Sequence, residues 1–183
     1  MPPQETPNPA PVAATNTFTA RDVVEILRAQ GWLPGDASPA QFAWCERAAA
    51  LLGPHLTDRQ CLADLLQLVF HYDAKELLAK VENHAVLSRY AARDVLRHLA
   101  LLLLDGAPLT TERFKEIITA LKDRVGLGSR ELFHPIRLAL AGRAGAGDLD
   151  RVILLLDEAA ALSFAAPVKS ARERILEFCA ALD

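Results

Sequence analysis

The sequence predicts an all-α protein, a helical bundle or cage of about eight to nine helices. Hydrophobic residues make up 51% of the 183 residues but aromatic residues only 6%. The apolar residues are therefore mostly leucine, alanine, valine and isoleucine, which favours helix packing over an aromatic-rich β-sandwich. Capping residues, apolar stripes at helical spacing and glycine stops recur along the chain. No alternating run of β-branched residues predicts a strand.

Local signals place the elements at the start of the chain. Residues 1–17 contain five prolines and almost nothing that could fill a core, so we expect a disordered, proline-rich tail. An apolar stripe over Val23–Leu27, stopped by Gly31, predicts the first helix. Ser38-Pro39 is a cap followed by proline at the first helical position, and the helix that it opens runs to Gly53-Pro54.

The next two helix starts are predicted by a capping residue that is followed three residues later by a glutamine or a glutamate. Thr57 and Gln60 form a possible capping box, and Asp73 and Glu76 repeat the device. Helical periodicity then resumes as one helix over about 85–105.

Further helices fill the C-terminal part. Thr110 or Thr111 caps an amphipathic helix that ends at a glycine, and Asp148 or Asp150 begins another. The last helix covers about 168–182.

We divide this helical region into two expected subdomains, 18–110 and 111–183. Trp32 and Trp44 are expected to pack between helices rather than to stack on bases.

The most informative stretch is Glu131–Arg143, ELFHPIRLALAGR. Pro135 has no backbone N–H and a fixed φ, so we expect it in the first turn of a helix. Gly142 can adopt the left-handed conformation that ends one. This arrangement holds the Arg137 guanidinium near a sharp chain reversal, with a second arginine, Arg143, just past it.

Several classes of chemistry have no counterpart in the sequence. A net charge of −3 argues against broad, sequence-independent binding of nucleic acid. The same net charge still allows a local basic face on the protein. No phosphate-binding glycine loop, dinucleotide fingerprint or H-E-x-x-H motif occurs, so we expect no enzyme activity, no metal and no cofactor. Three isolated cysteines fit a reducing cytoplasm. The longest strictly apolar run, Leu99–Leu104, is far too short to span a bilayer.

ELFHPIRLALAGR resembles the signature near the C-terminus of bacterial glutamyl-tRNA synthetases, a helix of the type "lfhPlRvALTGr". Residues 114–127, FKEIITALKDRVGL, resemble the long helix that precedes this signature, and Arg172–Leu176, RERIL, resembles the closing helix. The resemblance is specific over 112–176 and extends as a helix pattern over about 40–183.

In that class I family this region is the C-terminal anticodon-binding domain, so the resemblance implies recognition of a tRNA anticodon loop, with tRNA-Glu or tRNA-Gln as the partner. The HIGH-like and KMSKS-like motifs of the family's catalytic domain are absent here. We therefore expect a free-standing, non-catalytic module, and the low-complexity tail at Met1 suggests a natural start.

Six basic residues are candidates for contact with RNA. Arg137, Arg143 and Arg130 would supply stacking planes and base contacts, and Lys169, Arg172 and Arg174 would add phosphate contacts from the last helix. The alternative for Arg137 is a structural ion pair with an acidic residue such as Glu131 or Asp148. The alternative for the last three is a solvated helix face.

The chain also departs from the family pattern near the turn that would face RNA. Ala141 stands where the family has threonine, and Ala146-Gly147-Asp148 replaces a Gly-Pro-acidic turn. These changes leave a second function open: a helical protein-interaction scaffold that has kept the fold and lost RNA binding. A synthetase or an amidotransferase is the protein partner that we consider for either function.

Overall fold

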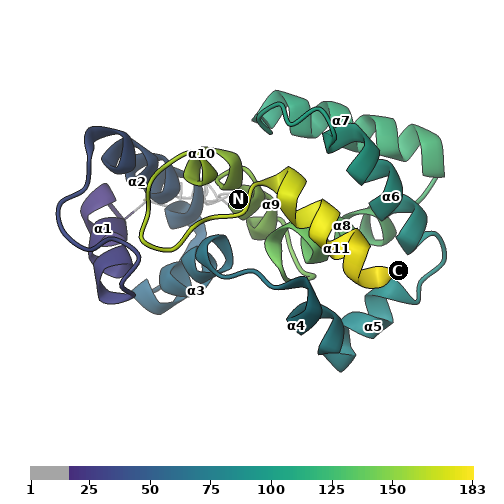
Figure 1. Cartoon of the computed structure of the whole chain (residues 1–183), viewed down its shortest axis with the longest axis horizontal. Coiled ribbons are helices and arrows are strands. Elements are labelled where there is room, and N and C mark those ends of the chain that lie inside the picture. The colour runs from purple at the N-terminus through teal and green to yellow at the C-terminus, as the bar shows by residue number, and fades with distance from the viewer. Residues whose placement is uncertain (1–16) are drawn as a thin grey trace, which may run out of the picture.

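The computed structural model describes residues 17–183, and these residues form eleven α-helices and one short 3-10 helix (Figure 1). In chain order the elements are α1 (Ala20–Ala29), α2 (Pro39–Leu52), η1 (Gly53–His55), α3 (Arg59–Phe70), α4 (Ala74–Ala79), α5 (Val81–Leu87), α6 (Ala92–Leu103), α7 (Thr111–Val125), α8 (Ser129–Ala141), α9 (Asp148–Ile153), α10 (Leu156–Ala160) and α11 (Ala171–Leu182). No strand occurs in this range, so the all-α prediction is confirmed. The helices outnumber the eight to nine expected because several segments contain short, separate helices. The predicted disordered tail lies, apart from Thr17, outside the described residues.

Helix starts follow the capping residues closely. The Ser38 hydroxyl accepts a hydrogen bond from the Gln41 backbone N–H, and the Gln41 side chain accepts one from the Ser38 N–H, which is the reciprocal capping box. The Thr110 hydroxyl caps α7 in the same manner by accepting from the Arg113 N–H. Asp73 caps α4 as expected, but Glu76 turns away from the cap to His71 Nε2, 2.9 Å distant.

The predicted start at Thr57 is wrong by one residue. Asp58 is the N-cap of α3, and its carboxylate accepts from the Cys61 N–H at 2.8 Å. A carboxylate one position further along competes successfully for the same backbone donors, since aspartate and threonine are both good caps.

The single helix expected over 85–105 is also wrong. The chain leaves α5 at Leu87 and turns through Ala91, whose φ of 61° is left-handed, before α6 begins at Ala92. A left-handed alanine is unfavourable by itself. Both α5 and α6 pack against α8, and we infer that this packing supports the turn between them. The turn contains no glycine or proline from which the sequence could have predicted it.

Pro135 does not open a helix. It lies inside α8, which begins six residues earlier at Ser129. Leu132 and Ile136, spaced by four residues, are both fully buried, so tertiary packing holds the two turns before the proline in the helix. The stop at Gly142 is confirmed: this residue ends α8 with a φ of 81°.

The two ends of the molecule are built from segments far apart in the chain. Helices α1–α3 lie with α10 at one end, and α4–α8 lie with α11 at the other (Figure 1). Trp44 is fully buried and donates its indole N–H to the Leu155 carbonyl, and Trp32 stacks on Phe70, which confirms the packing role of both tryptophans. Buried side chains from both expected subdomains join one cluster, and the boundary at 110/111 stays a prediction.

Candidate nucleic-acid interface

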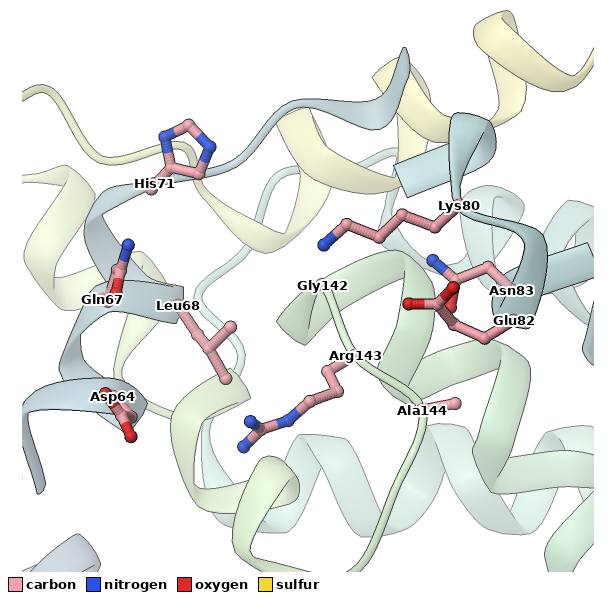
Figure 2. A pocket seen from close by; sticks show the side chains of 10 residues that line it. All are labelled: Asp64, Gln67, Leu68, His71, Lys80, Glu82, Asn83, Gly142, Arg143 and Ala144. Atoms are coloured by element: carbon pink, nitrogen blue, oxygen red, sulfur yellow. The ribbon is translucent and has the colours of Figure 1, made fainter. Parts of the chain in front are cut away.

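A surface hollow of about 580 Å³ lies beside the turn that follows α8 (Figure 2). Its walls come from the last turns of α3, from the start of α5 and from the first residues after α8. The residues around it are Asp64, Gln67, Leu68, His71, Lys80, Glu82, Asn83, Gly142, Arg143 and Ala144. The sequence-predicted chain reversal thus borders a concave surface that three separate segments create.

Arg143 and Lys80 are the cations of this hollow, and both side chains extend into it (Figure 2). Both are exposed, and neither side chain forms a hydrogen bond or an ion pair within residues 17–183. Two carboxylates, Asp64 and Glu82, line the same hollow. Its formal charge is therefore balanced, and any anion must be bound locally by the two free cations rather than by a broad positive surface.

Arg137 is held in a fixed position by the turn itself. Its Nε and Nη2 donate to the two carboxylate oxygens of Asp150 at 2.7 and 2.9 Å, and its Nη1 donates to the Gly145 carbonyl at 2.7 Å. The guanidinium also lies 4.6 Å from the centre of the Phe133 ring. An ion pair was one of the expected alternatives, but the partner is Asp150 rather than Glu131 or Asp148. Arg137 therefore ties α8 to α9 and closes the loop between them.

Arg174 was predicted to contact an RNA phosphate, with a solvated helix face as the alternative, and the burial of its side chain contradicts both. Its side chain has 0% relative exposure, and it donates only to backbone carbonyls in the interior. It has no path to an RNA phosphate in this structure. Spacing offered a signal: Arg174 is four residues before the buried Phe178, so both lie on one face of α11.

The other two candidates on this segment lie outside the hollow. Lys169 is partly buried, and its Nζ lies 2.6 Å from a Glu177 carboxylate oxygen. Arg172 is exposed and donates its Nε to the Leu104 carbonyl at 3.0 Å. Their proposed phosphate contacts therefore belong to a different part of the surface from Arg143.

A second group of basic residues consists of Arg130 and His134 on α8 and Arg89 in the turn between α5 and α6. Arg89 donates to His134 Nδ1 at 2.9 Å, so the imidazole accepts at this atom. Burial, followed by the positive charges of Arg89 and Arg130, lowers the pKa of His134. Arg130 itself is exposed and forms no hydrogen bond or ion pair in the described part of the chain.

The sequence analysis missed three residues that shape the site: Lys80, Tyr72 and Asp150. Tyr72 is buried directly behind Gly142, at the turn that follows α8. Lys80 separates two short helices and reaches the hollow only because the chain turns there. Asp150 could have been found as an acidic residue in the first turn of the next helix, near enough in sequence to pair with Arg137.

The described residues contain no group of three or more His, Cys, Asp or Glu side chains that could hold a metal ion. None of the helices in residues 17–183 combines the length and the apolar character that crossing a bilayer requires. What the fold and the site define is an all-helical domain with free cations beside a glycine-ended helix.

Residues 19–163 match the family described as an anticodon binding domain, and the chain belongs to this family. The domain is related to glutamyl-tRNA synthetases, as the signature in α8 implied. It is 28% identical over 123 residues to glutamate–tRNA ligase 2 of Syntrophus aciditrophicus, covering 67% of this chain and 25% of the relative. It is 29% identical over 126 residues to glutamate–tRNA ligase of Geobacillus stearothermophilus, covering 69% of this chain and 25% of the relative.

A third relative, glutamate–tRNA ligase of Carboxydothermus hydrogenoformans, is 32% identical over 95 residues, covering 52% of this chain and 18% of that protein. The chain thus spans about a quarter or less of the length of the curated relatives that it matches. The family model that this chain matches is that of the anticodon binding domain.

Proposed function

We propose that this protein binds the anticodon loop of a tRNA at the hollow beside α8, with Arg143 as the principal contact. The observation that carries the proposal is the free, exposed guanidinium of Arg143 at the rigid end of α8, facing a concave surface in an anticodon binding domain.

The chemistry of the hollow suits a single-stranded loop. Proteins read such RNA by stacking unpaired bases on aromatic or guanidinium planes and by hydrogen bonds to base edges. Arg143 can stack on a base or grip a phosphate with two parallel hydrogen bonds, and Lys80 can neutralise a neighbouring phosphate. The volume of about 580 Å³ falls within the range of about 300–1,000 Å³ that is usual for ligand pockets.

Arg137 and Arg143 have different roles in this proposal. The Nε, Nη1 and Nη2 donors of Arg137 are engaged with Asp150 and Gly145, so its role is to hold the turn that presents Arg143. Arg130 remains a predicted stacking or base contact, and Lys169 and Arg172 remain predicted phosphate contacts. Arg174 is withdrawn from the set because it is buried.

The names of the relatives point to tRNA-Glu as the first RNA to test, with tRNA-Gln as the second. Because the family match covers only an anticodon binding domain, we propose a non-catalytic, free-standing module that acts beside a synthetase or an amidotransferase.

Fluorescence anisotropy with labelled tRNA-Glu, tRNA-Gln and a tRNA of unrelated anticodon tests the proposal. Losing one bidentate contact costs about 1–3 kcal/mol, so Arg143→Ala should weaken binding about 5- to 150-fold. Lys80→Ala should reduce the salt dependence by about one phosphate contact. Arg21→Ala, an exposed arginine on α1 at the other end of the molecule, is the matched control and should bind as the unmodified protein does. Absence of saturable binding, or normal binding by Arg143→Ala, would overturn the proposal.

The balanced charge of the hollow and the neutralised Arg137 favour the scaffold as the second candidate function. Its test is co-purification of a synthetase or an amidotransferase that survives nuclease treatment. Recovery of such a protein together with no saturable tRNA binding supports the scaffold, and recovery of tRNA alone counts against it.

A further inference from the structure

Among residues 17–183, one fully buried arginine forms no ion pair with a carboxylate. Arg174, on α11, is fully buried and forms no ion pair within residues 17–183. Its Nε donates to the Lys169 carbonyl, its Nη1 donates to the Leu68 and Leu140 carbonyls, and its Nη2 donates to the Val69 carbonyl. Every acceptor is a backbone carbonyl, three of them in the last turns of two other helices.

Those helix ends supply direct hydrogen-bond acceptors for the buried charge, and the carboxylates of Glu177 and Asp157 stabilise it from a greater distance. Leu68 and Val69 lie in the last turn of α3, and Leu140 lies in the last turn of α8. The last carbonyls of a helix lack intrahelical donors and carry partial negative charge. Burial lowers the pKa of Arg174 to about 10, so the guanidinium is still protonated at neutral pH.

Tyr72 extends the same arrangement. The Arg174 guanidinium lies 4.6 Å from the centre of the Tyr72 ring. The phenol hydroxyl lies 2.5 Å from the Ala139 carbonyl oxygen and 3.2 Å from that of Arg174, and it donates to them. Burial raises the pKa of Tyr72, which keeps this donor protonated.

The elements that Arg174 and Tyr72 join form two of the three walls of the hollow, the α3 wall and the wall formed by the residues after α8. On the α3 wall, Leu68 links the buried arginine to the hollow. Its carbonyl accepts from Arg174, and its side chain lines the hollow. On the other wall, Gly142 follows Leu140 by two residues, and a Cβ atom built on Gly142 would lie 4.0 Å from the Tyr72 ring. Arg174 therefore connects the α3 wall to the Gly142–Arg143 wall from behind.

We propose that Arg174, together with Tyr72, is a positioning residue for the RNA-binding hollow: it sets the distance between the two walls and so pre-organises Arg143. The proposal rests on the proposed function for its consequence in binding. Arg174 does not touch RNA and acts through the backbone of α8 and the turn after it. Preorganisation of this kind removes an ordering cost from the binding step.

The geometry requires a guanidinium rather than any cation. Its planar fork reaches acceptors on α3 and α8 at the same time, whereas an ammonium is a compact charge with three donors on one atom. Arg174→Lys therefore keeps the charge and loses the connection between the walls. Tyr72→Phe keeps the ring and loses only the hydroxyl that holds the Ala139 carbonyl.

The test compares these two variants with Phe178→Leu, a matched core change on α11. Phe178 is fully buried one turn after Arg174 and forms no hydrogen bond with either wall. Two readouts are measured at a temperature at which every variant is folded: amide hydrogen exchange over residues 140–146 without RNA, and the dissociation constant for tRNA-Glu by anisotropy.

We expect Arg174→Lys and Tyr72→Phe to accelerate exchange in the turn and to weaken RNA binding about tenfold, as small misplacements of a binding group do. Phe178→Leu should lose stability while both readouts stay within about twofold of the unmodified protein. Equal effects of all three variants on both readouts would overturn the proposal.

The two proposals fail in different ways. If the unmodified protein binds no tRNA, the proposed function fails, and faster exchange in the turn for Arg174→Lys and Tyr72→Phe alone still supports the positioning role. If Arg174→Lys does not fold, Tyr72→Phe carries the test, and its normal exchange and binding would reject the role.

Discussion

Replacing Arg137 by alanine tests the assignment of this residue to the turn rather than to the RNA. The change removes two hydrogen bonds to Asp150, one to the Gly145 carbonyl and the stacking on Phe133. It also leaves the Asp150 carboxylate, which is only 24% exposed, without its cationic partner.

The size of the effect follows from the partial burial of the pair. A hydrogen bond to a charged group contributes about 1.5–3 kcal/mol, and the three bonds of Arg137 do not add fully. Breaking a fully buried pair costs about 3–5 kcal/mol, but water reaches this pair, whose side chains are 13% and 24% exposed. We therefore expect Arg137→Ala to lower the free energy of unfolding by about 2–3 kcal/mol. For a chain of this length, that loss lowers the melting temperature by about 5–10 °C.

Urea unfolding followed by circular dichroism measures this loss. A double-mutant cycle with Asp150→Ala isolates the pair, and we expect a coupling energy of about 1.5 kcal/mol or more. Arg143→Ala is the control, because an exposed, unpaired side chain six residues away should cost less than about 0.5 kcal/mol. An Arg137→Ala loss as small as that of the control, or strict additivity in the cycle, would refute the reasoning.

The remaining predictions concern backbone conformation, acid stability and thiol reactivity. Ala91→Gly should stabilise the protein by about 0.5–1 kcal/mol, since glycine adopts the left-handed φ of 61° without penalty, and Gly142→Ala should destabilise it by about 1–2 kcal/mol at a φ of 81°. Backbone N–H groups at the starts of α3 and α4 hold the pKa of Asp58 and Asp73 below the usual value. The folded pKa of each carboxyl is lower than its unfolded pKa of about 3.9, so the stabilisation that these two caps contribute is complete above that pH. It is lost as the pH falls through the folded pKa. Acid titration of the unfolding midpoint measures this loss. Burial raises the pKa of the Cys45 thiol to about 12, so a thiol reagent should modify it only on global unfolding.

Each of these has a control in the same chain. Gly147→Ala changes a glycine with a negative φ and open space around its Cβ position, so a loss equal to that of Gly142→Ala would contradict the backbone argument. Asn substitutions at Asp58 and Asp73 should flatten the acid titration, and an unchanged slope would exclude these caps as its source. Cys61 and Cys179 are half-buried and should react before Cys45, so simultaneous modification of all three thiols would contradict the burial argument.

Much of the fold is predictable from the sequence because helix starts and stops are local. Ser38, Asp73 and Thr110 cap helices, and Gly142 ends one, through contacts within a few residues of each. The start of α3 was misplaced by one residue for a local reason, but two larger failures share one tertiary cause. Ala91 interrupts a continuous helical pattern without a breaking residue, and α8 continues through Pro135, because packing with distant segments outweighs the local preference in both places.

The candidate site is predictable only in part for a related reason. Arg137, Arg143 and Arg174 are chemically identical in the sequence, yet one is paired, one is free and one is buried. Arg174 lies four residues before Phe178 and so on the same face of α11, but the prediction did not use this spacing. Three of the four carbonyls that accept from its guanidinium come from residues more than thirty positions away.

The sequence by itself determined the all-helical class and, through ELFHPIRLALAGR, the resemblance to an anticodon-binding domain. Both depend on residue types at fixed short spacings, which the chain carries wherever it folds. Only the tertiary structure decided which arginine is available to a ligand. Availability depends on the acceptors that α3, α8 and α9 bring to each guanidinium, and those acceptors come together only when the helices pack.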